Sequence, residues 1–275
     1  MNIFMTGAGG FIGKHLKKRL ETTHRLHTPD REFFEKTSDQ GLSQFMREQE
    51  IDVVIHLATH FVRKHTCSDV APIIDSNILL GSRILEALKD YPKTWFINTG
   101  TALEHTGPDY DRPHNFYAST KASFQSILKS YSLPHVTLKL FETYGPEDNR
   151  DKILNLIHRS ARTKETLPLT PGEQELEMAY IDDVIDAYER ILELLSSPEL
   201  IRNKTFAVAG TRVSLQDLVG VYEKETGSQV PVHWGAIPYR DNEIMKPWSD
   251  FASVPGLGPR VSLERGIQKT FVITS

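Results

Sequence analysis

One segment of this chain carries residues whose types and spacing suit proton transfer. Tyr117-Ala118-Ser119-Thr120-Lys121 places a phenol and an ammonium four residues apart, on one face of a helix if the segment is helical. A phenol ordinarily loses its proton at about pH 10, and a nearby positive charge lowers that value. A tyrosine tuned in this way can exchange a proton with an alcohol or carbonyl oxygen while a nicotinamide ring exchanges hydride.

Such a pair needs a third group, because the reacting oxygen must be held while the proton moves. A hydroxyl at the end of a neighbouring strand suits this role. The segment Thr99-Gly100-Thr101 follows an apolar strand at Thr94–Asn98. We expect Thr101 to be that hydroxyl, with Thr99 as the alternative.

A glycine turn at the start of the chain is typical of dinucleotide binding. Gly7, Gly10 and Gly13 lie between a short apolar strand at residues 2–6 and a helical pattern that Phe11 and Ile12 open. Such glycines make a tight turn, let the backbone approach a pyrophosphate and allow close packing of helix on strand. The order strand, glycine turn, helix therefore predicts a cofactor site that includes these residues.

The form of the cofactor depends on residues near the end of a second strand at 25–28. Asp30 lies at about the distance from Gly13 that suits a carboxylate bound to the ribose 2′-hydroxyl of NAD. Its neighbours Arg31 and His27 could instead meet the 2′-phosphate of NADP. We expect NADP(H) by a small margin over NAD(H), with Arg31 or His27 as the determinant.

Strand and helix patterns alternate through the first half of the chain. Alternation of this kind predicts an α/β protein with a doubly wound parallel sheet of the Rossmann type and helices on both faces. The pattern loosens after residue 145. We therefore expect a dinucleotide-binding domain at 1–145, to which later segments return, and a smaller lobe that binds substrate at 146–275. The helices expected to border or carry the site span 11–20, 73–88 and 116–131.

Composition excludes several other classes of protein. The chain has 275 residues, 39% of them hydrophobic, and a net charge of −4, so nothing indicates a surface for nucleic acid. The single cysteine, Cys67, excludes an intrachain disulfide. No apolar run is long enough to span a membrane, and a strand that begins at Asn2 leaves no room for a signal peptide. We expect a cytoplasmic protein without nucleic-acid or membrane partners, and the histidines lack metal-site spacing.

Further motifs extend the pattern along nearly the whole chain. Thr6–Gly13 and Tyr117–Lys121 are joined by His56-Leu57-Ala58, Asn77-Ile78, Tyr144-Gly145-Pro146 and Tyr180-Ile181-Asp182-Asp183-Val184. With these motifs the chain resembles the extended short-chain dehydrogenases/reductases, in the group of nucleotide-sugar epimerases, dehydratases and reductases. The last two motifs resemble those that border the sugar-nucleotide lobe of that branch.

The resemblance implies roles for named residues. It implies a catalytic set of Thr101, Tyr117 and Lys121, in which Lys121 also hydrogen-bonds the nicotinamide ribose. It implies that Asn77 supports the active site beside the cofactor. It also implies that Leu57, Ala58 and Thr59, where the strand at 52–58 ends, line the cofactor site.

Departures from the family pattern narrow the choice among the reactions of the family. Family members that eliminate water carry acidic residues directly after the catalytic threonine, where this chain has Ala102 and Leu103. This argues against a 4,6-dehydratase. The connection from Thr101 to Tyr117 is short, as in the reductases of the family. The substrate-contacting asparagine before Tyr-Gly-Pro is Glu142 here, and a preceding arginine is Lys139, so substrate contacts at these two positions do not carry over directly.

The resemblance is strongest to 4-ketoreductases that act on CDP- or dTDP-linked 4-keto-6-deoxyhexoses, which is the function we expect. The expected substrate residues are Thr101, Tyr117, Glu142 and Arg240, the last gripping the diphosphate through its guanidinium. The alternative enzyme is a 4-epimerase that retains NAD and returns hydride to the opposite face. A non-catalytic sensor of NAD(P) is a third reading, which the intact Tyr117–Lys121 pair disfavours. The family also implies a homodimer.

Overall fold

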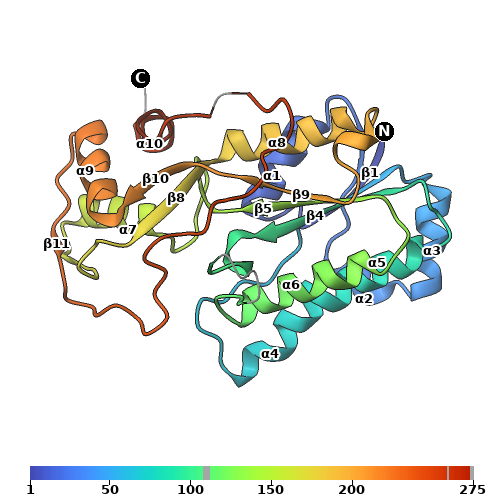
Figure 1. Cartoon of the computed structure of the whole chain (residues 1–275), viewed down its shortest axis with the longest axis horizontal. Coiled ribbons are helices and arrows are strands. Elements are labelled where there is room, and N and C mark those ends of the chain that lie inside the picture. The colour runs from blue at the N-terminus through green and yellow to red at the C-terminus, as the bar shows by residue number, and fades with distance from the viewer. Residues whose placement is uncertain (108–111, 259, 273–275) are drawn as a thin grey trace. The chain divides into compact units, whose positions relative to one another are not determined.

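The structure is a computed structural model that describes residues 1–107, 112–258 and 260–272 (Figure 1). The chain forms two compact units. The first comprises Met1–Leu140, Ile185–Val208 and Asp250–Leu257, and the second comprises Phe141–Val184, Ala209–Ser249 and Gly258–Ser275. The assignment of residues 1–145 to cofactor and 146–275 to substrate remains a prediction.

The first unit is built on a parallel sheet of six strands in the order β2-β1-β3-β4-β5-β9. The strands are β1 (Asn2–Thr6), β2 (Arg25–His27), β3 (Val53–His56), β4 (Trp95–Thr101), β5 (His135–Leu140) and β9 (Lys204–Val208). Every residue of β3 and β5 is buried, as expected for central strands covered on both faces. The order reverses between β1 and β3. Ligands of such sheets bind outside the carboxyl ends of the strands at this reversal.

Helices cover both faces of this sheet, which confirms the doubly wound fold (Figure 1). The helices of the first unit are α1 (Phe11–Leu20), α2 (Arg31–Lys36), α3 (Asp39–Glu48), α4 (Cys67–Ile74), α5 (Leu80–Leu88), α6 (Phe116–Lys129) and most of α8 (Ile181–Leu194). Arg19 of α1 bonds Asp186 and Glu189 of α8 on one face. On the other face, α3, α5 and α6 enclose a core around Phe96 and Phe124.

One long helical run differs from the sequence expectation of a single helix at 73–88. It begins six residues earlier, at Cys67, where Thr66 and Asp69 form a reciprocal cap. Between α4 and α5 the backbone adopts a π-helical stretch, Asp75–Leu79. Such stretches are rare and often mark functional positions. This one carries the buried side chain of Asn77.

The second unit contains two small sheets. One has the order β10-β8-β6, formed by β6 (Glu142–Tyr144), β8 (Glu175–Tyr180) and β10 (Thr211–Ser214), and the other pairs β7 (Leu167–Pro168) with β11 (Val232–His233). Its helices are α7 (Ile153–Thr163), α9 (Leu215–Thr226) and α10 (Leu263–Phe271). Tyr144 and Tyr180 meet edge to face, and α10 passes Tyr144 at Gly266, where a β-carbon would not fit. Among the described residues, no helix is long and apolar enough to cross a membrane.

Candidate active site

The glycine turn between β1 and α1 is packed too tightly for side chains at two of its positions. Gly7 has a φ of +73°, and a β-carbon there would lie 2.6 Å from the Ala58 nitrogen. A β-carbon on Gly13 would lie 2.7 Å from Ala8 Cα and closer still to the Gly7 oxygen. The turn is closed by the Gly10 N–H, which donates to the Gly7 carbonyl at 3.0 Å. Glycine is therefore required at these two positions for the turn itself.

The same turn fits a dinucleotide. A β-carbon on Gly9 would meet no protein atom within 4 Å, so the backbone there is open to a close ligand. Helix α1 begins at Phe11 and Ile12 with Gly10 as its cap residue, and glycine has no side chain with which to cap the helix. A helix N-terminus presents N–H donors and a positive dipole end to a pyrophosphate. The residues predicted to bind the cofactor at this turn thus suit that ligand.

The ends of β1 and β3 are joined by a buried polar contact next to the turn. Thr6 Oγ1 lies 2.9 Å from His56 Nδ1 and accepts the Ala58 N–H at 3.2 Å. Leu57 is buried, and Ala58 follows it along the wall that Gly7 approaches. The contact fixes the loop after β3 at the reversal point of the sheet. Thr6 and His56 therefore stabilise the loop that borders the candidate cofactor site.

His56 is buried without a hydrogen-bond partner for Nε2 among the described residues. It packs against the rings of Phe96 and Phe124, 5.8 and 5.3 Å away between centroids. Burial, with a smaller effect of the Lys121 charge, lowers the pKa of His56 to about 3. The imidazole is therefore neutral in the folded protein at ordinary pH.

A prediction about acid stability follows from His56. The unfolded chain binds a proton at this imidazole below about pH 6.5, whereas the folded protein binds it only near pH 3. Between these values the unfolded state holds more protons, so stability falls as the pH is lowered, by about 1.4 kcal/mol per pH unit from this group. Thermal melts from pH 7 to 4 should show a shallower decline in His56→Gln than in the parent protein. Equal slopes would contradict the buried neutral state.

Asn77 ties the loop after β3 to α6. Its Oδ1 accepts from Thr59 Oγ1 at 2.9 Å and from the His60 N–H at 2.8 Å. Its Nδ2 donates to the His60 carbonyl at 3.2 Å and to Thr120 Oγ1 at 3.0 Å. These four bonds occupy the amide, so the geometry supports a role in holding Thr59 and α6 in place.

Tyr117 and Lys121 lie one turn apart on α6, which Asn115 caps by accepting the Ala118 N–H at 2.9 Å. Tyr117 is half-buried, and the ring of Phe61 meets it edge to face at 4.9 Å between centroids. Lys121 is 2% exposed. Burial lowers the pKa of Lys121 from 10.5 to about 8, against the opposing effect of the Glu104 charge. The helical spacing predicted for the pair is therefore present.

The two candidate hydroxyls have different hydrogen-bond partners in the structure. Thr99 Oγ1 lies 2.6 Å from the hydroxyl of Tyr188, which is completely buried. Thr101, the last residue of β4, accepts the Leu103 N–H at Oγ1 over 3.3 Å. Thr99 is thus bonded to a buried hydroxyl, and the role of Thr101 toward a substrate oxygen remains a prediction.

Sequence reasoning did not identify Glu104, which forms a reciprocal cap with Thr101 around a short 3-10 turn, Ala102–Glu104. Its carboxylate binds the ammonium of Lys139 at 2.7 Å, and both side chains are buried. Lys139 is therefore the partner of a buried carboxylate within the first unit. A lysine in a fully buried strand was the available signal, since buried charges are almost always paired.

The residues proposed to select the cofactor lie where β2 ends. Asp30 caps α2 by accepting the Phe33 N–H at 2.9 Å. Arg31 pairs with Glu35 one turn along the helix, and its side chain is 93% exposed. His27 meets the Phe45 ring edge to face. Arg31 is thus the basic group of this set with the freest access to solvent.

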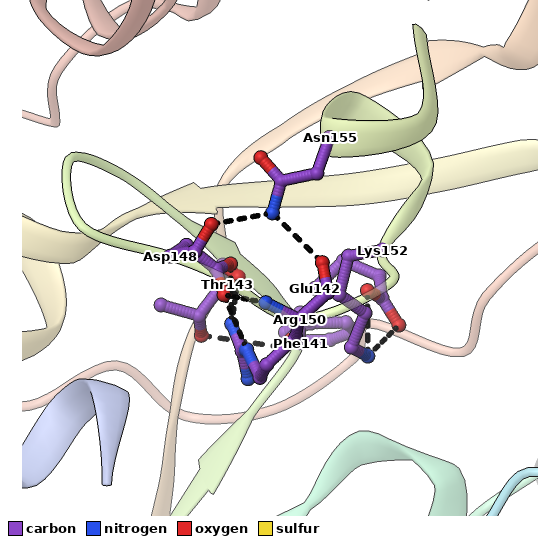
Figure 2. A network of polar contacts seen from close by, with 7 residues as sticks. All are labelled: Phe141, Glu142, Thr143, Asp148, Arg150, Lys152 and Asn155. Atoms are coloured by element: carbon purple, nitrogen blue, oxygen red, sulfur yellow. Dashed lines mark hydrogen bonds and ion pairs between the residues drawn. The ribbon is translucent and has the colours of Figure 1, made fainter. Parts of the chain in front are cut away.

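Glu142 belongs to a polar network in the second unit (Figure 2). Lys152 Nζ donates to both of its carboxylate oxygens, at 3.1 and 3.0 Å. Beside this pair, Arg150 grips Asp148 through two nitrogens and donates to the Thr143 carbonyl at 2.8 Å. Asn155 donates to the carbonyls of Asp148 and Arg150. The loop that follows Tyr144-Gly145-Pro146 is thereby held against β6.

Arg240 lies in an exposed turn of the second unit. The Glu243 N–H donates to its carbonyl at 3.0 Å. The turn is anchored by the preceding residue, because the Glu173 N–H donates to the Tyr239 hydroxyl at 3.0 Å. The guanidinium is thus carried by a fixed turn. Among the described residues, no group of three or more histidine, cysteine, aspartate or glutamate side chains could hold a metal ion.

A doubly wound sheet, an open glycine turn and a buried lysine one turn after a tyrosine define a dinucleotide-binding oxidoreductase. The chain belongs to the NAD dependent epimerase/dehydratase family, whose model matches residues 3–203. It is accordingly an NAD-dependent enzyme of the oxidoreductase type, and the resemblance noted from its motifs is confirmed.

Its relatives include enzymes with two different reactions. The chain is 27% identical to a CDP-abequose synthase of Salmonella muenchen, over 97% of this chain and 96% of that protein. It is 22% identical to a probable UDP-glucuronate 4-epimerase of Rhizobium meliloti, over 98% and 95%. A structure of UDP-glucuronic acid 4-epimerase from Bacillus cereus, in complex with UDP-glucuronic acid and NAD, matches with a TM-score of 0.84 at 24% identity and covers 98% of both chains. This last likeness concerns the fold.

Proposed function

We propose that the protein reduces the 4-keto group of a nucleoside-diphosphate-linked 6-deoxyhexose, the CDP- or dTDP-linked sugar being the preferred substrate. The observation that carries this proposal is the chemical nature of the residues that follow Thr101 in the chain. Ala102 and Leu103 offer no acid or base for elimination, and the next carboxylate, Glu104, is buried in an ion pair with Lys139. Likeness to CDP-abequose synthases over nearly the whole of both chains supports the same class of substrate.

The residues of the first unit can perform the reduction in a simple sequence. The nicotinamide dinucleotide, when bound, supplies the hydride. Thr101 Oγ1 already accepts the Leu103 N–H, so its hydroxyl proton can point to the substrate oxygen. Tyr117 Oη gives its proton to that oxygen as the carbonyl becomes an alcohol. The Lys121 ammonium stabilises the phenolate that remains, because opposite charges close together favour the ionised form.

We propose that the cofactor is held by Gly7, Gly10, Phe11, Ile12 and Gly13 at the turn, and by Leu57, Ala58, Thr59, Asn77 and Lys121 beyond it. Asp30 and Arg31 would meet the adenosine ribose. An exposed guanidinium at Arg31 supports NADP(H) over NAD(H). Dissociation constants for NADPH and NADH, measured on the parent protein and on Arg31→Ala, test this preference. An unchanged ratio in the variant would contradict it.

We propose that the second unit binds the nucleotide sugar, with Glu142 near the sugar and Arg240 at the diphosphate. The Lys152 ammonium offsets the negative charge of Glu142, which supports the binding of an anionic nucleotide sugar by this unit. A homodimer is part of the same proposal and is tested by analytical ultracentrifugation.

The test is an assay with CDP-4-keto-6-deoxyglucose and its dTDP counterpart, prepared enzymatically, with NADPH or NADH as reductant. We expect one equivalent of reduced cofactor to be consumed per sugar and an alcohol to appear at C4. The epimerase alternative is favoured by the NAD-bound fold relatives. Bound NAD in the purified protein, interconversion of UDP-sugar epimers and no net consumption of reductant would replace the proposal by that alternative.

A further inference from the structure

The first unit contains a buried ion pair that the proposed proton transfer does not use. The side chains of Glu104 and Lys139 are 2% and 3% exposed, with 2.7 Å between Oε2 and Nζ. Burying two charges removes them from water, and well-packed apolar residues often stabilise a fold at least as well. A pair of this kind beside Thr101 therefore suggests a purpose other than stability.

One oxygen of the pair acts directly on Thr101. Glu104 Oε1 accepts the Thr101 N–H at 2.8 Å. Thr101 Oγ1 in turn accepts the N–H of Leu103, the residue before Glu104. The main chain and the hydroxyl of Thr101 are thus both oriented by the 3-10 turn. The neighbouring Gly100 leaves room for this arrangement, since a β-carbon there would lie 2.8 Å from Glu104 Oε1 and 3.2 Å from Lys139 Cγ.

The other end of the pair is held by aromatic groups. Lys139 Nζ also bonds His105 Nε2, and it lies 5.9 Å from the centroid of the Phe251 ring. The His105 and Phe251 rings are 5.4 Å apart between centroids. The ammonium is therefore fixed by a carboxylate, an imidazole and a ring face. This leaves the Glu104 carboxylate little freedom to leave Thr101.

The charge of Glu104 also acts on Lys121, whose pKa it raises against the larger effect of burial. From β3, the imidazole of His56 faces Lys121 and is neutral, because its pKa is about 3. Tyr117 lies one turn earlier on α6, and the Lys139 ammonium is bonded to Glu104 itself. Glu104 is thus the anionic group that acts on Lys121 among these neighbours.

We propose that Glu104, anchored by Lys139, is a positioning residue that fixes Thr101 at the end of β4 and places a buried negative charge within electrostatic reach of Lys121. The inference rests on the proposed roles of Thr101 and Lys121. It assigns two effects to one carboxylate, one through its hydrogen bond to Thr101 and one through its charge. Variants that remove either the charge or the hydrogen-bond acceptor therefore separate the two effects.

Two variants make this separation. Glu104→Gln removes the charge and keeps an acceptor for the Thr101 N–H. We expect it to leave amide hydrogen exchange at Thr101 near the parent rate. In the parent, affinity for NADH should fall above about pH 8, as Lys121 loses its proton. In Glu104→Gln we expect that fall at a lower pH, by up to about one unit.

The double variant Glu104→Leu/Lys139→Met removes the acceptor together with both charges, and an apolar pair of this kind often preserves the fold. We expect exchange at the Thr101 amide to become about tenfold faster or more. The turnover number should fall by up to about 10²-fold while NADH affinity at pH 7 is retained. Tyr188→Phe is the matched control, because it removes a buried hydrogen bond on the same strand, at Thr99. It should lower the melting temperature and leave exchange at Thr101 and the pH profile unchanged.

The possible outcomes decide each part separately. Parent-like exchange at Thr101 in the double variant would overturn the positioning role, and an unmoved pH profile in Glu104→Gln would overturn the charge effect. Absence of keto-sugar turnover by the parent protein would count against the proposed function alone, since measurement of amide exchange needs no substrate. A parent protein whose NADH affinity does not depend on pH would count against Lys121 as a cofactor contact, and Thr101 exchange would then decide the inference.

Discussion

Tyr117→Phe should lower the turnover of the keto-sugar by about 10²- to 10⁴-fold and leave NADH affinity close to that of the parent. The phenylalanine keeps the ring, and so keeps the edge-to-face contact with Phe61, but it has no proton to give to the forming alkoxide. Steady-state rates of NADPH consumption with the CDP- and dTDP-linked 4-keto sugars, beside fluorescence titrations with NADH, measure the two quantities.

Tyr131→Phe provides the matched control for this substitution. Tyr131 follows the same helix, α6, and its hydroxyl donates to Glu86 at 3.2 Å on the exposed side of the unit. Removing that hydroxyl should change neither turnover nor NADH affinity by more than about twofold, because exposed polar contacts contribute little. Full activity of Tyr117→Phe would exclude Tyr117 as the proton donor.

Features set by local sequence were predicted well. The glycine turn and α1 depend on residues that are neighbours in the chain, and the structure has both of them where the pattern placed them. The central strand β3 was also found within the strand expected at 52–58, because a run of apolar and β-branched residues is a strong signal. These elements suffice to identify the doubly wound class.

Features that depend on distant partners were missed. Strands β8 and β10 pair through Glu177 and Arg212, a charged cross-strand pair that resembles a loop when each strand is read alone. One local feature was missed as well. The short helix α2 was overlooked because Asp30 was considered only as a ribose ligand, whereas it is also a helix cap. The π-helical stretch at Asp75–Leu79 leaves no mark in a pattern of apolar spacing.

For the same reason, some contacts of the site could be predicted from the sequence and others could not. Tyr117 and Lys121 are four residues apart, so helical periodicity alone brings them together. The partnership of Glu104 with Lys139 joins a turn to the next strand of the sheet. The sequence shows at most a lysine within a segment that is rich in apolar residues, and the identity of its partner requires the register of β4 against β5.

Gly13→Ala should destabilise the protein by about 1–3 kcal/mol or more and reduce NADH affinity at least about tenfold. The added methyl group would lie 2.7 Å from Ala8 Cα and closer to the Gly7 carbonyl, which are backbone atoms that cannot turn away. Helix α1 must then shift from the turn, and its N–H groups no longer converge where a pyrophosphate would bind. Chemical denaturation and NADH titration measure the two effects.

Two alanine substitutions at other glycines separate this clash from the mere loss of a glycine. Gly220, inside α9, and Gly9, at the tip of the turn, would each gain a methyl group with open space around it, since apart from the adjacent backbone no described residue comes within 4 Å. Gly220→Ala should stabilise the helix by about 0.5–1 kcal/mol, because alanine loses less backbone entropy on folding. Gly9→Ala should keep the stability of the parent, so that any loss of NADH affinity reports a ligand lying against the turn. Parent-like NADH affinity in both Gly9→Ala and Gly13→Ala would place the cofactor elsewhere and remove the basis for the proposed reduction.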